Sequence, residues 1–217
     1  MAALTTYQEY TMTATLRSIA AIQPVEQLAA ASTAVLLIDF QNEYYRGRVP
    51  IPDGLPALRN ANRLAALADA HGMPVFHIQH VNGPTAPVFA AGSVMAEIHP
   101  QLAVRPQHVV VRKDRVSSFA GTDLHAQLQA RGIRTLIIGG LMTHMCVSTA
   151  TRDARQFGAQ SYQVLVAADA CASRDITGWN GGVTSAQDLH DVTLTALSDN
   201  FAQVLTTNAI LELSVTA

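Results

Sequence analysis

The chain has 217 residues, which is enough for one large domain with a substantial core and short for two. Apolar residues make up 49% of the sequence and charged residues 14%, a composition that excludes an intrinsically disordered chain. The formal net charge is −2, and no extended run of Lys and Arg is present. We therefore expect neither nucleic acid nor an anionic membrane as a partner.

The cysteine content and the start of the chain indicate a compartment. Cys146 and Cys171 are the only cysteines, which excludes a dense disulfide framework and a zinc site built on Cys pairs. No apolar stretch approaches the about 20 residues that cross a bilayer. The first 30 residues also lack the apolar core of a signal peptide, because Arg17, Gln23 and Glu26 interrupt it. We therefore expect a soluble, cytoplasmic protein.

Residues 1–31 differ in composition from the remainder of the chain. They are rich in Ala and Thr, are broken by Pro24, and show only a weak helical pattern over residues 16–22. Two interpretations stay open for this segment, a partly ordered tail or an arm that packs on a neighbouring subunit. The folded domain is expected to span residues 32–217.

From Thr33 onward, short apolar runs alternate with helical patterns. The runs predict six buried strands, at 35–38, 75–78, 109–111, 136–138, 164–166 and 204–205. The helical patterns lie at 55–67, 122–132, 143–157 and 189–197. Repeated strand–helix alternation predicts an α/β fold, a three-layer α/β/α domain with a mainly parallel six-stranded sheet.

Three reactive side chains come directly after predicted strands. Asp39 follows the first strand, Lys113 follows the third, and Cys146 opens the helix after the fourth. Ligand sites in parallel sheets lie beyond the carboxyl ends of the strands. The sequence therefore predicts that these three side chains meet in one site.

Each of these residues also has a simpler interpretation. A thiol near a helix N-terminus is expected to favour the nucleophilic thiolate, but a lone cysteine such as Cys146 is often an inert core residue. Asp39 suits proton transfer if it is desolvated, and otherwise serves as a cap for local amides. Lys113 is costly to bury unless an anion lies nearby. Cys171 fits a structural role better than a catalytic one.

Several segments together resemble a known family. They are 37–42 around Asp39, Lys113 with 117–119 behind it, 140–154 around Cys146, then 169–171 and His190. The set resembles the isochorismatase-like cysteine hydrolase superfamily, which includes nicotinamidases, N-carbamoyl amidohydrolases, ureidoacrylate amidohydrolases and streptothricin hydrolase. The likeness covers roughly residues 33–207. It implies a homo-oligomer, a dimer or tetramer, acting on a small molecule.

The resemblance also implies a mechanism. The family's Asp–Lys–Cys triad falls on Asp39, Lys113 and Cys146, and its non-proline cis peptide falls on Leu141–Met142. The backbone N–H groups of Met142 and Cys146 would then form an oxyanion hole. The implied reaction is hydrolysis of a small amide, ureido or related C–N bond through a thioester on the cysteine.

One family feature is missing from the sequence. Nicotinamidases carry an Asp-x-His metal element after the second strand, where this chain has His77-Ile78-Gln79-His80. Each histidine is better explained as a packed or hydrogen-bonded side chain. We therefore expect no metal and no other cofactor, and nicotinamide is a poor substrate candidate.

The substrate pocket is less clearly marked. Asn42, Tyr44, Phe119 and Trp179 are the candidate substrate-binding residues, although core packing explains the aromatic rings equally well and Asn42 can instead brace Asp39. The region from 80 to 106 lacks periodicity and contains several Gly and Pro residues, so we expect it to cover the site.

Three other functions remain as alternatives. Vinyl-ether hydrolysis of isochorismate uses the same fold but does not need the thiol, so the presence of Cys146 favours acyl transfer. A nucleotide-binding domain is disfavoured because no GxGxxG or GxxxxGK[ST] motif is present. A non-catalytic binding protein is disfavoured because all three triad positions are filled.

Overall fold

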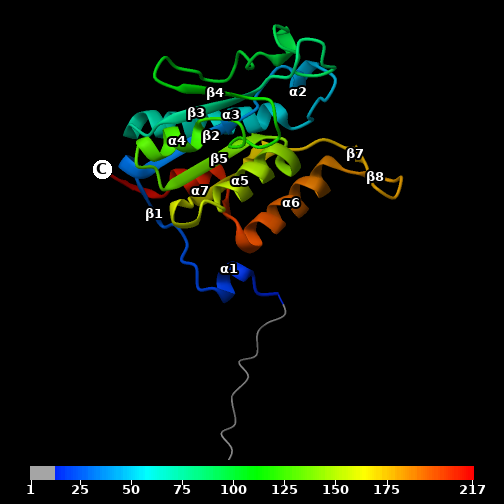
Figure 1. Cartoon of the computed structure of the whole chain (residues 1–217). Helices are drawn as coiled ribbons and strands as arrows, with labels where there is room; N and C mark the ends of the chain where they lie inside the picture. Colours follow the sequence, from blue (N-terminus) through cyan, green and yellow to red (C-terminus); the bar gives the residue numbers. More distant parts are fainter. Residues whose placement is uncertain (1–12) are drawn as a thin grey trace, which may run out of the picture.

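A computed structural model describes residues 13–217, and residues 1–12 lie outside it. Six strands form one sheet in the order β4-β3-β2-β5-β6-β9, and every pair of neighbours is parallel (Figure 1). The six predicted strands are confirmed. They are β2 (Thr33–Ile38), β3 (Val75–His80), β4 (Val109–Lys113), β5 (Thr135–Leu141), β6 (Gln163–Ala172) and β9 (Gln203–Leu205).

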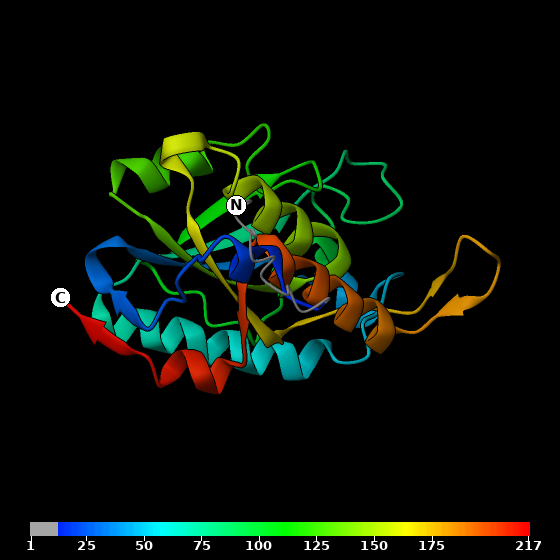
Figure 2. The same ribbon diagram turned by 90° about the horizontal axis from the view of Figure 1, so that it is seen from below.

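Helices cover both faces of this sheet, as Figure 2 shows, and confirm the three-layer architecture. One face carries α3 (Gly54–His71) and α7 (Thr207–Leu211); the other carries α4 (Leu124–Ala130), α5 (Ser148–Ala154) and α6 (Ala186–Asn200). Side chains alternate along each strand, so Val35 and Leu37 join the core beneath α3 while Leu36 and Ile38 join the opposite core. Burial on both faces explains why β2 is apolar throughout.

The predicted helix at 55–67 is the longest helix in the described part of the chain, α3. Its buried positions recur at helical spacing, from Ala57 and Leu58 through Ala61 to Leu64 and Ala68. The helix ends at Gly72, which has a φ of 69° and donates its N–H to the carbonyl oxygens of the last turn.

The two glycines of β5 allow a close approach at the centre of the sheet. A Cβ atom on Gly140 would lie 2.6 Å from the Cβ of Ile38 and 2.7 Å from its carbonyl oxygen. Only glycine fits there without moving β2. The pairing of β5 with β6 also shifts register between Ile138 and Gly140, immediately before the segment that carries Cys146.

The predicted helix at 143–157 is correct in type but not in form. Its first five residues, Thr143–Val147, make a π-helical turn (η3), and regular α-helix covers only Ser148–Ala154. The helix ends there because Tyr162 donates its N–H to the Ala154 oxygen and the chain turns back at Gly158, whose φ is 59°. Such π turns often occur at functional sites.

The described part of the N-terminal segment packs on the C-terminal part of its own chain. It contains α1 (Leu16–Ile19) and β1 (Gln27–Ala29), and β1 pairs in parallel with β10 (Ser214–Thr216). The Leu16 N–H donates to Asp199 at 2.8 Å and the Val25 N–H to Gln203 at 2.6 Å. Residues 13–31 therefore pack on the domain of their own chain, and a contact with a neighbouring subunit stays a prediction. None of the helices within residues 13–217 is long and apolar enough to cross a membrane.

A short hairpin follows β6. It consists of β7 (Ile176–Thr177) and β8 (Val183–Thr184), and it projects away from the body of the molecule (Figures 1 and 2).

Candidate active site

The three predicted reactive side chains meet at the carboxyl edge of the sheet. The Lys113 Nζ lies 2.9 Å from the Asp39 Oδ2 and 3.2 Å from the Cys146 Sγ. All three residues are buried, with 0% of Asp39, 3% of Lys113 and 5% of Cys146 exposed. Because the interior screens charge weakly, the ion pair couples strongly to the neighbouring sulfur.

The ammonium group of Lys113 stays charged in this environment. Burial by itself lowers its pKa, but Asp39 and Cys146 outweigh burial and the resulting pKa of Lys113 is raised. The backbone oxygen of Arg115, at 3.1 Å, and that of Val116, at 3.4 Å, also accept hydrogen bonds from Nζ. The loop after β4 therefore holds a permanent cation beside the sulfur.

The surroundings of Cys146 favour its thiol form, although the end of a helix by itself favours the thiolate. Burial and then the negative charge of Asp39 raise the pKa of the thiol, and Lys113 only partly opposes them. The positive end of the helix is expected to lower the pKa of this thiol. That effect is too small to outweigh burial and the charge of Asp39 in a site nearly free of water. The nucleophile therefore needs a base.

Asp39 is placed to be that base. Its side chain is fully buried, its Oδ2 forms an ion pair with Lys113, and its charge acts on the Cys146 thiol. Its φ of 57° lies in the left-handed region, which Asp tolerates better than most residues. Its N–H donates to the Ile78 oxygen at 2.9 Å, which joins this turn to the end of β3.

The residues after Asp39 support the turn. Gln41 donates from Nε2 to the oxygens of His80 and Ala96, both at 2.7 Å, and accepts the His80 N–H at 2.8 Å. Asn42 donates to the Val94 oxygen at 2.8 Å, while its own buried Oδ1 has no hydrogen-bond partner among residues 13–217. Gln41 therefore supports this turn through His80 and Ala96, and Asn42 combines a bond to the Val94 oxygen with an acceptor that no described residue satisfies.

The segment from 81 to 106 reaches the site through Phe89. Its ring packs edge-on against Tyr44, with centroids 5.1 Å apart, and lies 5.2 Å from the ring of His80. Phe89 has a φ of 51°, an unfavourable backbone conformation for a bulky residue. Burial first, and then the charges of Asp39 and Cys146, raise the pKa of Tyr44. The predicted cover over the site is consistent with these contacts.

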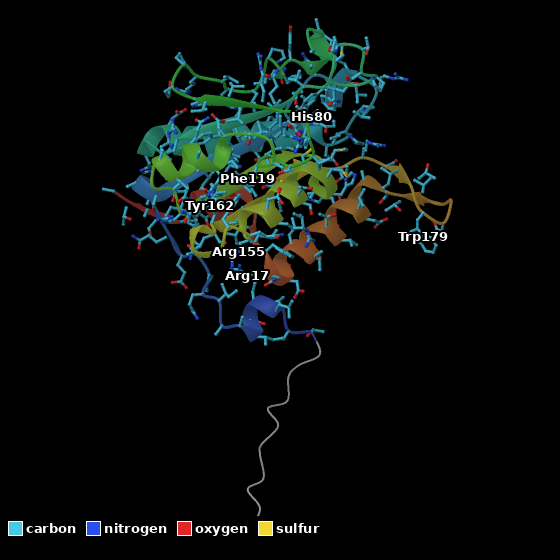
Figure 3. The ribbon with its side chains drawn as sticks, in the orientation of Figure 1. Arg17, His80, Phe119, Arg155, Tyr162 and Trp179 are labelled. Carbon is cyan, nitrogen blue, oxygen red and sulfur yellow. The ribbon has the colours of Figure 1, made fainter. Side chains whose placement is uncertain are left out.

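Two candidate substrate-binding residues are not brought to this group. Phe119 packs against Phe157 and Tyr162 in the helical layer, where it lines a separate cavity of about 380 Å³. Trp179 is 100% exposed in the projecting hairpin, far from the labelled His80 in Figure 3. The triad could be predicted because side chains just past the ends of parallel strands lie at the same edge of the sheet, and the direction of the backbone alone sets that position. Ring orientation depends on packing between distant elements, which local sequence does not reveal.

His80 is a hydrogen-bonded histidine, as the sequence analysis expected, but its place beside the triad was not predicted. His80 ends β3, and its Nδ1 lies 3.2 Å from the Lys113 Nζ. Ligating atoms of Asp39, His80 and Cys146 all lie within 4.8 Å of one another, but the ammonium of Lys113 occupies the same space. A divalent cation would first have to displace it. The position of His80 at a strand end was the signal that could have identified it.

The peptide bond between Leu141 and Met142 is cis, at the position that the resemblance implied. The Met142 N–H donates to no other group in residues 13–217, whereas its carbonyl oxygen accepts from Met145 and Val147. A free donor therefore lies four residues before the sulfur-bearing residue, where an oxyanion hole would need one.

The chain is similar to several known proteins. It is 33% identical over 183 residues to the uncharacterized isochorismatase family protein YddQ of Bacillus subtilis, covering 83% of this chain and 99% of that protein. It is 31% identical over 187 residues to the secreted isochorismatase effector Isc1 of Verticillium dahliae, covering 86% and 94%. A cytoplasmic location therefore stays a prediction, since one relative is secreted.

A named hydrolase and a solved structure extend the comparison. Streptothricin hydrolase of Streptomyces noursei is 31% identical over 170 residues, which cover 78% of this chain and 58% of that protein. The crystal structure of an isochorismatase from Pseudomonas putida superposes with a TM-score of 0.82 at 29% identity, covering 90% of this chain and 97% of that one. An Isochorismatase domain matches residues 33–209. The chain therefore belongs to the isochorismatase family of hydrolases and has its cysteine-hydrolase fold.

Proposed function

We propose that this protein hydrolyses a small amide, ureido or related C–N bond, with Cys146 as the nucleophile and a thioester as the intermediate. The observation that carries the proposal is the contact of one buried ammonium with both a carboxylate and a thiol. The similarity to streptothricin hydrolase supports a hydrolase of this kind.

The first half of the reaction uses the charges already present. Asp39 takes the thiol proton, and the Lys113 ammonium stabilises the thiolate that results. The net charge of the three groups stays at zero during this transfer, so the buried site gains no uncompensated charge. The thiolate then attacks the carbonyl carbon of the substrate.

In the second half of the reaction, Asp39 returns the proton to the leaving group and water hydrolyses the thioester. The N–H groups of Met142 and Cys146 hold the negative charge that develops on the substrate oxygen. Asp39 gives its proton to the departing nitrogen as the C–N bond breaks, which leaves a thioester on Cys146. Water attacks the thioester while Asp39 takes its proton, and the thiol is regenerated as the acid leaves.

Two side chains beside the triad are proposed to contact the substrate. Asn42 offers a buried Oδ1 that no described residue satisfies, and Tyr44 lies close enough for the negative charge of Asp39 to affect its hydroxyl. A buried acceptor that lacks a donor in the free protein is well suited to a substrate N–H.

The test is a panel of small amides and ureido compounds. Ammonia release is measured for the wild type, for Cys146→Ala and for the matched control Cys171→Ala, and mass spectrometry of the intact protein follows an acyl group on Cys146. We expect hydrolysis by the wild type and by Cys171→Ala, with none by Cys146→Ala. Pyruvate release from isochorismate, unaffected by Cys146→Ala, would instead assign vinyl-ether hydrolysis.

A further inference from the structure

We infer that His80 is a fourth functional residue of the site, a positioning residue whose neutral imidazole holds the Lys113 ammonium toward Asp39 and Cys146. The inference rests on the proposed cysteine-dependent hydrolysis, because it assigns His80 a role through the cation of that triad.

The strand register places His80 beside Lys113. In the pairing of β3 with β4, His80 and Lys113 are direct partners, so their side chains lie side by side on the same face of the sheet. β3 itself lies between β4 and β2, the strand that leads into Asp39. Each of four adjacent strands thus contributes one polar side chain at its carboxyl end, and His80 is the contribution of β3.

Hydrogen bonds determine which nitrogen of His80 faces the ammonium. The Asn82 Nδ2 donates to the Val88 oxygen at 3.1 Å, so the Asn82 Oδ1 is the atom that lies 2.8 Å from the His80 Nε2. Nε2 therefore carries the hydrogen and donates it to Asn82. The lone pair of Nδ1 is left facing the Lys113 Nζ at 3.2 Å, as the acceptor for one ammonium hydrogen.

Only the neutral form of His80 can do this. A protonated imidazole has no lone pair at Nδ1, and it would place a second positive charge 3.2 Å from the ammonium. The charged and titratable groups that face His80 are Lys113 from β4, Asp39 after β2 and Cys146 from η3. The ring of Phe89 covers it from the 81–106 segment.

A competing explanation is present in the same site. The ammonium has three hydrogens, of which Asp39 and Cys146 accept two. The third is directed toward His80 and toward the carbonyl oxygens of the loop after β4. If those carbonyl oxygens were sufficient, removing the imidazole would leave Lys113 where it is.

Two substitutions separate these explanations. His80→Asn keeps an acceptor oxygen near the place of Nδ1, whereas His80→Leu has no acceptor. We expect His80→Leu to lower kcat by about 10²-fold with little change in KM, since a small displacement of a catalytic group has effects of that size. His80→Asn should recover most of this loss, because its side-chain oxygen can accept the same ammonium hydrogen. Gln79→Leu, on the same strand, is the matched control.

A second readout needs no substrate. The rate at which iodoacetamide alkylates Cys146 is measured against pH in a Cys171→Ala background, with circular dichroism confirming the fold. His80→Leu should slow alkylation and His80→Asn should restore it. If no amide is cleaved by the wild type, the proposed function fails, while this measurement still decides the role of His80.

Two results would overturn the inference. If His80→Leu keeps the alkylation rate and the kcat of the wild type, the carbonyl oxygens suffice to hold Lys113. If His80→Leu and His80→Asn lose kcat equally, only the shape of the ring matters. If His80→Leu does not fold, Asn82→Ala removes the acceptor that fixes the tautomer, and it should lower kcat without altering KM.

Discussion

β3 carries two histidines three residues apart, and they belong to different buried networks. His80 ends the strand beside Lys113 in the candidate active site. His77 lies within the strand, where its Nε2 is 2.9 Å from the Nδ1 of His108, whose Nε2 is in turn 3.0 Å from Asp69. His108 directly precedes β4, so this second network lies toward the amino-terminal edge of the sheet.

The two networks differ in whether they contain a nucleophile. In the amino-terminal network, Arg105 completes the contacts of Asp69 at 2.9 Å, and burial, followed by the charge of His108, lowers the pKa of His77 to about 4. This network joins the end of α3 to the start of β4 without a nucleophile. At the carboxyl edge, a thiol lies among opposite charges. The position along the strand, and not the residue type, therefore separates structural from functional histidines.

The largest expected effect is the loss of hydrolysis in Asp39→Asn. Asn tolerates the left-handed backbone at this position but cannot take the thiol proton, so we expect kcat to fall by about 10⁴-fold. Asp69→Asn makes the same change in the amino-terminal network and should lower stability without a comparable loss of kcat. Steady-state kinetics on the first substrate identified compare the two. Equal losses of kcat would remove the distinction between the networks.

The next effect is on stability. Lys113→Met leaves the Asp39 carboxylate buried without its counter-ion, and we expect the free energy of unfolding to fall by about 3–5 kcal/mol. The double variant Asp39→Asn, Lys113→Met removes both charges and should recover most of that loss while staying inactive. Urea unfolding of the three variants measures this. A double variant as unstable as the single one would contradict mutual compensation.

A smaller effect concerns acid pH. His77 has a pKa near 4 in the folded protein against 6.5 as its ordinary value, so the unfolded chain binds more protons between these two values. The stability that neutral His77 confers is therefore full above pH 6.5 and is lost as the pH falls toward 4, by up to about 3 kcal/mol. Urea unfolding at several pH values gives the free energy of unfolding as a function of pH. This free energy should fall less steeply toward acid pH for His77→Gln than for the wild type. Identical slopes would contradict the assignment.

The smallest effect is expected in the hairpin. Trp179 is fully exposed, so Trp179→Ser should change the free energy of unfolding by less than about 0.5 kcal/mol and leave KM unaltered. Thermal unfolding and kinetics of this variant provide the measurement. A clear rise in KM would return Trp179 to the substrate pocket, as first expected from the sequence.

The sequence by itself determined the order of the elements and the meeting of Asp39, Lys113 and Cys146. Both follow from local information, because apolar runs of strand length mark the buried strands and a side chain just past each strand must lie at one edge of a parallel sheet. The extended loop over the site was equally visible, as a long region without periodicity.

Only the tertiary structure decided which neighbours those side chains have. The register of β3 against β4 put His80, and not His77, beside Lys113, and packing against the rings of Phe157 and Tyr162 took Phe119 away from the site. The protonated state of Cys146 likewise depends on its burial and on a carboxylate more than a hundred residues away in the sequence. Desolvation and charge act through space, so distances between side chains, which a sequence does not contain, determine them.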